Sequence, residues 1–149
     1  MRRLGWFEPG HGADKNAIRG LESVLGLRLP DDFSEFASEF AGASNPDESE
    51  FDVLERSGRK WVGNLGSVLR LEGDDVETIL GTMRDLGSQI PPGVVPIVGT
   101  GSGDYVSLDF RSGDVSVVYF AHEKTGEDSL IPLASSFADF LEMVRAPLD

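Results

Sequence analysis

The sequence predicts an α+β domain in which an antiparallel sheet is flanked by about four helices. Two runs rich in β-branched and aromatic residues, 105–110 and 115–121, are separated by a short polar turn, which is typical of a β-hairpin. Apolar residues at helical spacing occur toward both ends of the chain. With 149 residues and no repeat or low-complexity linker, the sequence indicates a single domain over residues 1–149.

The first expected helix lies near the N-terminus. Asp14 suits its N-cap, Ile18, Leu21 and Leu25 recur at spacings of three and four, and Gly26 suits a left-handed C-terminal end. We therefore expect a helix from about residue 15 to 25.

A second helix is expected to begin at Asp31 or Asp32, where a carboxylate can cap free backbone N–H groups. It carries an apolar stripe of Phe33, Phe36, Ala37 and Phe40. Such an aromatic stripe could line a ligand pocket, but packing against a sheet is the commoner use. We interpret it as core.

The middle of the chain predicts a loop, extended segments and a third helix. Residues 43–50 have no periodicity and are expected to form an exposed loop before a strand at 51–55. Extended segments broken by glycine are expected over 59–71. A helix is expected to begin at Asp74 or Asp75 and to end near Gly87, with an apolar face of Val76, Ile79, Leu80 and Met83.

The remaining elements complete the sheet and add a last helix. Residues 94–98 and the hairpin predict three strands, and residues 130–133 are expected to add an edge strand. Ser136, with Asp139 three residues later, resembles a capping box. The helix that follows should bury Phe137, Phe140, Leu141 and Val144.

The net charge of the chain limits the kinds of partner that it can bind. Twenty-six acidic against 13 basic residues give a net charge of −13, which repels nucleic acid and anionic membranes and attracts a basic partner. General solubility or a salt-rich cytoplasm would also favour such acidity. With no cysteine, no signal sequence and no apolar run long enough to cross a bilayer, the sequence predicts a cytoplasmic protein.

The motifs predict no cofactor and no metal. The glycines of 99–103 resemble a phosphate loop, but a strand is expected to follow them and no lysine does. Residues 109–114 do not fit a calcium loop, and His11 and His122 lack metal-ligand spacing. We keep one enzymatic alternative, in which His122 acts as a general base with a neighbouring carboxylate.

Four stretches are informative through their order along the chain, and they are residues 22–33, 95–98, 101–109 and 133–141. Together they resemble the SUKH superfamily, which includes bacterial immunity proteins and regulators of fungal cell-wall synthesis. The family's asparagine and paired glycines after the second helix are replaced here by Ala-Gly-Ala-Ser-Asn at 41–45. The resemblance implies a non-enzymatic domain that binds and inhibits a toxin delivered by a competing cell, often a nuclease.

Combined with the charge pattern, the resemblance predicts an acidic surface that docks on a cognate, basic toxin. A regulatory or scaffold module that binds a host protein through an apolar patch is the alternative. The predicted partner-binding residues, chosen by charge density, are Asp47, Glu48, Glu50, Asp52, Asp74, Asp75 and Glu77.

Overall fold

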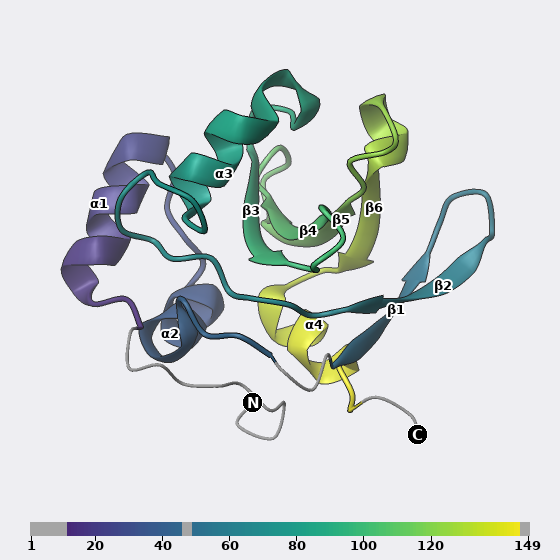
Figure 1. Ribbon diagram of the computed structural model, residues 1–149, viewed down its shortest axis with the longest axis horizontal. Coiled ribbons are helices and arrows are strands. Elements are labelled where there is room, and N and C mark those ends of the chain that lie inside the picture. Colours follow the sequence, from purple (N-terminus) through teal and green to yellow (C-terminus); the bar gives the residue numbers. More distant parts are fainter. Residues whose placement is uncertain (1–11, 46–48, 147–149) are drawn as a thin grey trace.

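A computed structural model describes residues 12–45 and 49–146 (Figure 1). Within these ranges the chain forms four α-helices and two antiparallel sheets, which confirms the predicted α+β class. The α-helices are α1 (Lys15–Leu25), α2 (Asp31–Phe40), α3 (Ile79–Leu86) and α4 (Phe137–Met143). The strands are β1 (Glu50–Leu54), β2 (Lys60–Asn64), β3 (Val94–Gly99), β4 (Tyr105–Asp109), β5 (Ser116–Phe120) and β6 (Leu130–Ala134).

Both ends of α1 follow the sequence signals. The Asp14 carboxylate accepts a hydrogen bond from the backbone N–H of Ala17 at 2.8 Å, and Gly26 adopts φ 68° as the helix ends. A left-handed residue at this position is readily supplied by glycine, which has no Cβ to clash with the following carbonyl. These features confirm the first predicted helix.

Helix α2 begins at Asp31 as predicted, but its N-terminus has a different cap. Pro30 is the N-cap residue and makes no side-chain hydrogen bond to the helix, so neither aspartate stands at the N-cap. Asp32, in the first turn, nevertheless satisfies a free backbone N–H, as the prediction of a capping carboxylate required. Its carboxylate accepts hydrogen bonds from the adjacent N–H of Phe33 and, at 3.0 Å, from the N–H of Ala138 in α4. One carboxylate thus joins the N-terminal turns of two helices.

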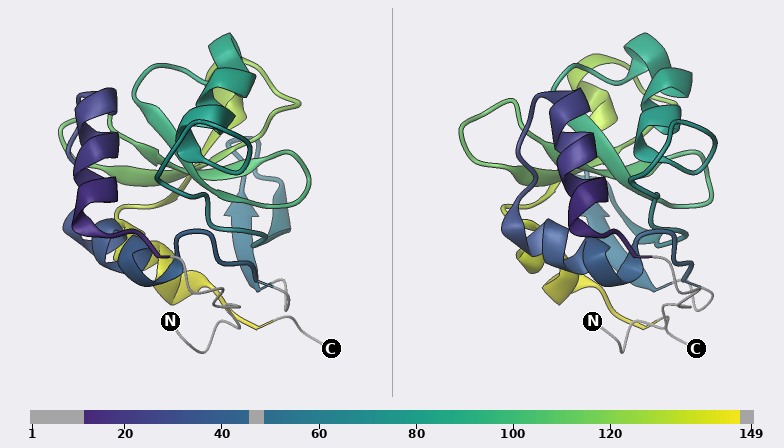
Figure 2. Two further views of the ribbon diagram at one scale, coloured as in Figure 1. Left: turned by 60° about the vertical axis from the view of Figure 1, so that its left-hand side comes forward. Right: turned by 90° about the vertical axis from the view of Figure 1, so that its left-hand side faces the viewer.

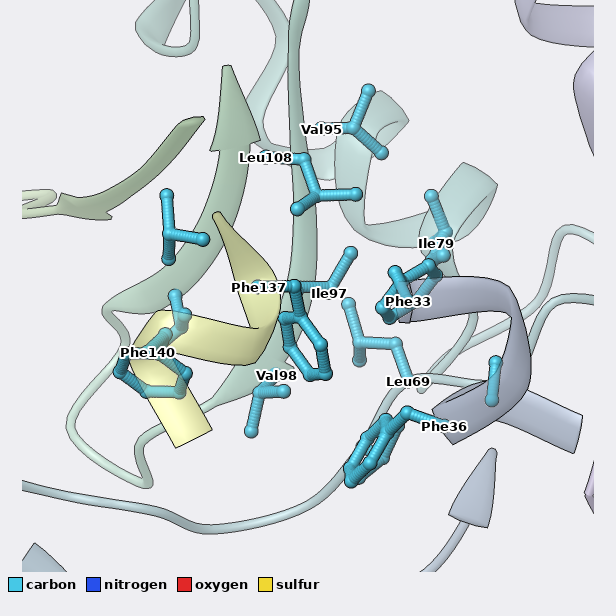
Figure 3. Packing of buried hydrophobic residues seen from close by; sticks show 14 of the residues in the cluster. Phe33, Phe36, Leu69, Ile79, Val95, Ile97, Val98, Leu108, Phe137 and Phe140 are labelled. Atoms are coloured by element: carbon cyan, nitrogen blue, oxygen red, sulfur yellow. The ribbon is translucent and has the colours of Figure 1, made fainter. Parts of the chain in front are cut away.

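The core lies between these two helices and one face of the larger sheet, and it is aromatic. Phe33 and Phe137 meet edge to face with ring centroids 5.3 Å apart, and Phe36 lies 4.9 Å from Phe137. Figure 3 shows these rings packing toward Ile97 and Val98 of β3. The aromatic stripe on α2 is therefore core, as predicted, and not the lining of a pocket.

The larger sheet has the order β3-β4-β5-β6, with every neighbour antiparallel. The predicted hairpin is confirmed as β4 and β5, and residues 130–134 form the expected edge strand β6. Alternate side chains point to opposite faces. One face joins the main core, and the other forms a smaller cluster of Ile90, Val94, Val118, Phe120 and Leu130.

The smaller sheet is the hairpin β1–β2, which extends to the side of the molecule away from α1 (Figure 1). Phe51 of β1 faces Gly63 of β2, where any side chain on residue 63 would overlap the Phe51 ring. After β2 the chain runs along β3, and the Leu69 N–H donates to the Ile97 carbonyl at 2.9 Å. This segment leads the chain from the hairpin to the opposite side of the molecule, next to α1, where α3 begins.

Helix α3 starts later than predicted. Thr78, not Asp74 or Asp75, is the N-cap, and its hydroxyl accepts from the Gly81 N–H at 3.0 Å. Val76 lies outside the helix with its side chain 69% exposed, so it is not part of the apolar face. The helix cannot begin earlier because Glu77 adopts φ 66°, which interrupts right-handed helical geometry. Its end at Gly87 agrees with the prediction.

Helix α4 begins where the sequence indicated. Ser136 is its N-cap and accepts from the Asp139 N–H at 3.1 Å, while Phe137 and Phe140 are buried. The Asp139 carboxylate accepts from the Ser135 hydroxyl. The chain then returns to β1, because Arg145 and Glu50 exchange two backbone hydrogen bonds of 2.7 and 2.9 Å.

Candidate functional site

The structure separates the acids that the sequence grouped together. Asp47 and Glu48 lie outside the described residues. Glu50 and Asp52 belong to β1, whereas Asp74, Asp75 and Glu77 belong to the segment between β2 and α3. Figure 1 shows that this segment lies beside α1, on the other side of the molecule from the hairpin.

The acids of the hairpin, which we call the hairpin acids, are Glu50, Asp52 and Glu55. Each contacts cations of this chain. Arg145 lies 3.1 Å from the Asp52 carboxylate and 3.6 Å from that of Glu50, and Lys60 lies 3.7 Å from Asp52. The Glu50 side chain is only 19% exposed. Much of the negative charge here is compensated internally.

Glu55 has the most enclosed carboxylate of the three, with its side chain 10% exposed. The indole N–H of Trp61 donates to it at 2.7 Å, and Lys124 and Arg59 approach within 3.5 and 3.6 Å. The Trp61 hydrogen bond, helped by these two cations, lowers the pKa of the Glu55 carboxyl below its ordinary value. Trp61 also packs edge to face on Tyr119 of β5. Glu55 therefore fastens the hairpin to the larger sheet.

The acids before α3, which we call the loop acids, are Glu72, Asp74, Asp75 and Glu77. All four residues are exposed. Asp74 and Asp75 keep 78% and 71% of their side-chain surface while pairing at 3.7 and 3.6 Å with Arg84 and Arg70. Within the described part of the chain, Glu72 and Glu77 form no salt bridge. These carboxylates remain accessible to a partner.

Hydrogen bonds hold the segment that carries the loop acids. The Arg70 backbone donates to the Glu77 carbonyl and accepts from the Ile79 N–H, both at 2.9 Å. The Arg70 guanidinium donates to the Val76 carbonyl at 2.9 Å, and the Thr78 hydroxyl donates to the Asp75 carbonyl at 2.6 Å. The segment therefore has a fixed shape without regular secondary structure.

Between this segment and α1 the surface is hollowed into a groove of about 660 Å³. Both views of Figure 2 show α1 and the segment before α3 side by side. Leu21 and Leu71 line it and are buried, so they form its floor, whereas Val24, Glu72 and Asp74 are exposed and stand at its edge. The groove is lined by Asp14, Asn16, Ala17, Gly20, Leu21, Val24, Leu71, Glu72, Gly73, Asp74 and Leu80. Sequence reasoning missed it because its two walls lie about fifty residues apart.

His122 does have a carboxylate neighbour, as the enzymatic alternative requires, and that neighbour is Asp104. The Nδ1 atom of His122 lies 2.6 Å from one Asp104 oxygen, which also accepts from the His122 backbone N–H at 2.9 Å. The Tyr119 hydroxyl donates to the other oxygen at 2.7 Å. Burial and this carboxylate raise the pKa of Tyr119. Both carboxylate oxygens are thus engaged in joining β4 to the end of β5.

The other motifs serve the fold. The glycine-rich residues 100–104 connect β3 to β4, and no helix follows them. Asp109 accepts from the Arg111 N–H at 3.0 Å and binds its guanidinium through both oxygens, so it holds the hairpin turn. His11 lies outside the described residues. In the described ranges, no three acidic or histidine side chains gather closely enough to hold a metal ion.

A second exposed network joins three loops. Glu127 accepts from Arg111 at 2.8 Å and from Arg56 in the β1–β2 turn at 3.5 Å. The arginines lower the pKa of the Glu127 carboxyl. Glu127 thus links the β1–β2 turn to the loop that follows β4, so an acidic residue again stabilises the hairpin side of the molecule.

Comparison with known proteins gives matches over most of the chain. The family model described as SMI1 / KNR4 family (SUKH-1) matches residues 12–143. A relative from Bacillus subtilis (strain 168), named SPbeta prophage-derived uncharacterized protein YokK, is 24% identical over 146 residues. The aligned region covers 89% of this chain and 75% of the relative. Among the described helices, none is long and apolar enough to cross a membrane.

Proposed function

The chain belongs to the SMI1 / KNR4 family (SUKH-1), as its sequence resemblance predicted, and from this premise we propose that it is an immunity protein. It binds a cognate polymorphic toxin in the cytoplasm and neutralises it by occupying the toxin surface, without catalysing a reaction. The observation that supports binding most directly is the row of exposed carboxylates beside an apolar groove on the α1 side.

The toxin we propose is basic, and a nuclease is the first class to test. Enzymes that cleave nucleic acid carry lysine and arginine where they hold phosphate groups. A protein with a net charge of −13 is attracted to such a surface and repelled by nucleic acid itself. Carboxylates that take the place of phosphates would block the enzyme.

All seven acids named from the sequence remain in the proposed contact set, but we rank them by what the structure adds. Asp74, Asp75 and Glu77 come first because they are exposed. Glu50 and Asp52 come second because their side chains are less exposed, at 19% and 43%, and pair with Arg145 and Lys60. Asp47 and Glu48 complete the set, which is Asp47, Glu48, Glu50, Asp52, Asp74, Asp75 and Glu77.

Co-expression tests this function. The chain would be expressed with the product of the neighbouring gene in its own genome, and growth and co-purification would be scored. Rescue of growth together with a stable complex is the expected result. A toxic neighbour that neither binds nor is neutralised would overturn the proposal.

A regulatory or scaffold role within the same family is the second candidate, and the apolar floor of the groove favours it. Such a partner would bind mainly through apolar contacts. Salt separates the two candidates, because attraction between exposed charges is screened as the Debye length shrinks. We expect the toxin complex to weaken by about tenfold or more between roughly 50 and 200 mM salt, and an apolar complex to change little.

A further inference from the structure

The groove beside α1 has apolar residues both on its floor and at its edge. Val24 of α1 is 67% exposed at one end, and Leu21 and Leu71 lie below it. Val76, 69% exposed, stands on the same segment as the loop acids. A groove of about 660 Å³ lies within the range of sites that receive ligands or side chains of a partner.

Gly20 adds a second observation that is independent of charge. It lies in the middle of α1 and lines the groove, and a Cβ atom placed there would meet nothing within 4 Å. Glycine weakens a helix interior relative to alanine. The packing of residues 12–45 and 49–146 gives no reason for it, whereas a partner approaching α1 closely would benefit from the missing side chain.

The opposite wall of the groove is built before any partner arrives. Gly81 of α3 lies so close to the carbonyls of Asp74 and Asp75 that no side chain fits between them. Together with the hydrogen bonds of Arg70 and Thr78, this close approach fixes the segment against α3. Because this wall is already ordered, binding does not have to offset the entropy cost of ordering it, and this favours affinity.

The rim of the groove selects the charge of its occupant. The carboxylates of Asp14, Glu72 and Asp74 line it, and those of Asp75 and Glu77 lie on the same segment before α3. Arg84 and Arg70 pair with Asp74 and Asp75. The excess is therefore negative even after both ion pairs are counted.

We propose that this groove receives a basic amphipathic helix of the protein partner. Its apolar side chains enter the floor between Val24 and Leu80, its backbone passes close to Gly20, and its lysines or arginines meet the carboxylates of the rim. Laying the apolar face of a helix into a groove is an established mode of protein recognition. The inference rests on the proposed function for the partner's identity and deepens it by naming the surface.

The first experiment measures affinity for the neighbouring gene product. The groove variants are Gly20→Trp, and Glu72→Lys combined with Asp74→Lys. A matched control, Asp114→Lys with Glu142→Lys, changes the net charge equally at exposed positions elsewhere. We expect each groove variant to weaken binding by at least about tenfold and the control by less than about threefold. Unchanged melting temperatures would show that the variants fold.

The outcomes separate the two proposals. If the neighbour binds wild type and the groove variants alike, while Glu50→Lys with Asp52→Lys abolishes binding, the groove inference is overturned and the immunity function stands. If the neighbour does not bind wild type at all, the proposed function fails, and the groove is then decided by a second measurement.

That measurement uses a probe of known chemistry on the full ¹⁵N-labelled chain. The probe is an 18-residue peptide of leucine and lysine with leucines on one helical face, and its control replaces every leucine with serine. We expect the leucine peptide to shift the amide signals of Gly20, Val24 and Gly73, and to bind at least about tenfold more tightly than the serine peptide. Equal binding of both peptides, or shifts away from these amides, would overturn the inference.

Discussion

The β1–β2 hairpin and the segment before α3 both carry several carboxylates, but the two groups differ in how far they are exposed in the folded chain. The hairpin acids contact Arg145, Lys60, Lys124, Arg59 and the indole of Trp61, and they help to fix the hairpin in place. The loop acids stay exposed, and backbone hydrogen bonds hold the segment beneath them. Charge density along a sequence therefore does not identify a binding surface until pairing and burial are known.

The largest effect on stability should come from disrupting the contact between α3 and the segment that carries the loop acids. Gly81→Ala places a methyl group onto the carbonyl of Asp75 and 2.8 Å from that of Asp74, so the segment must move. We expect a loss of about 2–3 kcal/mol in the free energy of unfolding, measured with urea. Gly20→Ala is the matched control in another helix, and there we expect a gain of about 0.5–1 kcal/mol. Equal effects at both glycines would contradict the described packing.

The next largest effect should come from the hairpin's aromatic contact. Trp61→Ala removes the ring that packs on Tyr119 and the donor to Glu55, and we expect a loss of about 2 kcal/mol. Trp61→Phe keeps a ring but no N–H, so its loss should be smaller. Thermal unfolding followed by circular dichroism would rank the variants, and a neutral Trp61→Ala would show that the hairpin does not depend on this contact.

A smaller loss should follow removal of the cation shared by two hairpin acids. Arg145→Met leaves Glu50 and Asp52 without the guanidinium that now contacts both carboxylates, while the backbone hydrogen bonds of residue 145 can persist. We expect about 1 kcal/mol of destabilisation, since these groups are partly exposed. The loss should shrink in high salt, and a salt-independent loss would point to packing of the arginine stem instead.

The loop acids should give a smaller change still. Asp74→Asn combined with Asp75→Asn removes two exposed ion pairs, and we expect the free energy of unfolding to change by less than about 0.5 kcal/mol. The same variant should weaken the partner complex. A stability loss as large as that of Arg145→Met would remove the contrast between the two regions.

The pH dependence of stability gives a further test of the role of the hairpin acids. The pKa of Glu55 is lowered in the folded state, so its ionised form stabilises the fold above the ordinary carboxyl pKa of about 4.3, and that stabilisation disappears as the pH falls through the lowered value. Wild type should therefore exceed Glu55→Gln in stability at pH 7, and the difference should narrow by pH 3. Unfolding curves at both pH values test this, and a constant difference would speak against the ionised carboxylate.

Local signals in the sequence predict much of this fold. The Asp14 cap, Gly26, the Ser136 cap and the β4–β5 hairpin depend on neighbours within a few residues, and the structure has all of them. The start of α3 was missed because Asp74 and Asp75 are good caps in isolation. The left-handed backbone at Glu77 and the close approach of Gly81 to the carbonyls of Asp74 and Asp75 exclude them, and neither feature can be recognised from the neighbouring residues in the sequence.

The candidate site is less visible in the sequence because its contacts are long-range. Arg145 lies 93 residues from Asp52, and the groove joins α1 to a segment that follows β2. Counting acids placed Glu50 and Asp52 beside Asp74 and Asp75 in one surface, although the fold carries the two pairs to different sides (Figure 1). An exposed valine such as Val24 at helical spacing with Ala17 and Leu21 is the one local hint of the groove.

The hydrogen bond from the Ala138 N–H to the Asp32 carboxylate joins positions 106 residues apart, and the Phe137 ring packs against Phe33 and Phe36 of α2 beside it. During synthesis the ribosome releases α2 long before α4. Until α4 emerges, Phe33 and Phe36 lack their contacts with the Phe137 ring, so this part of the aromatic core cannot be completed while the strands of the larger sheet are still being made.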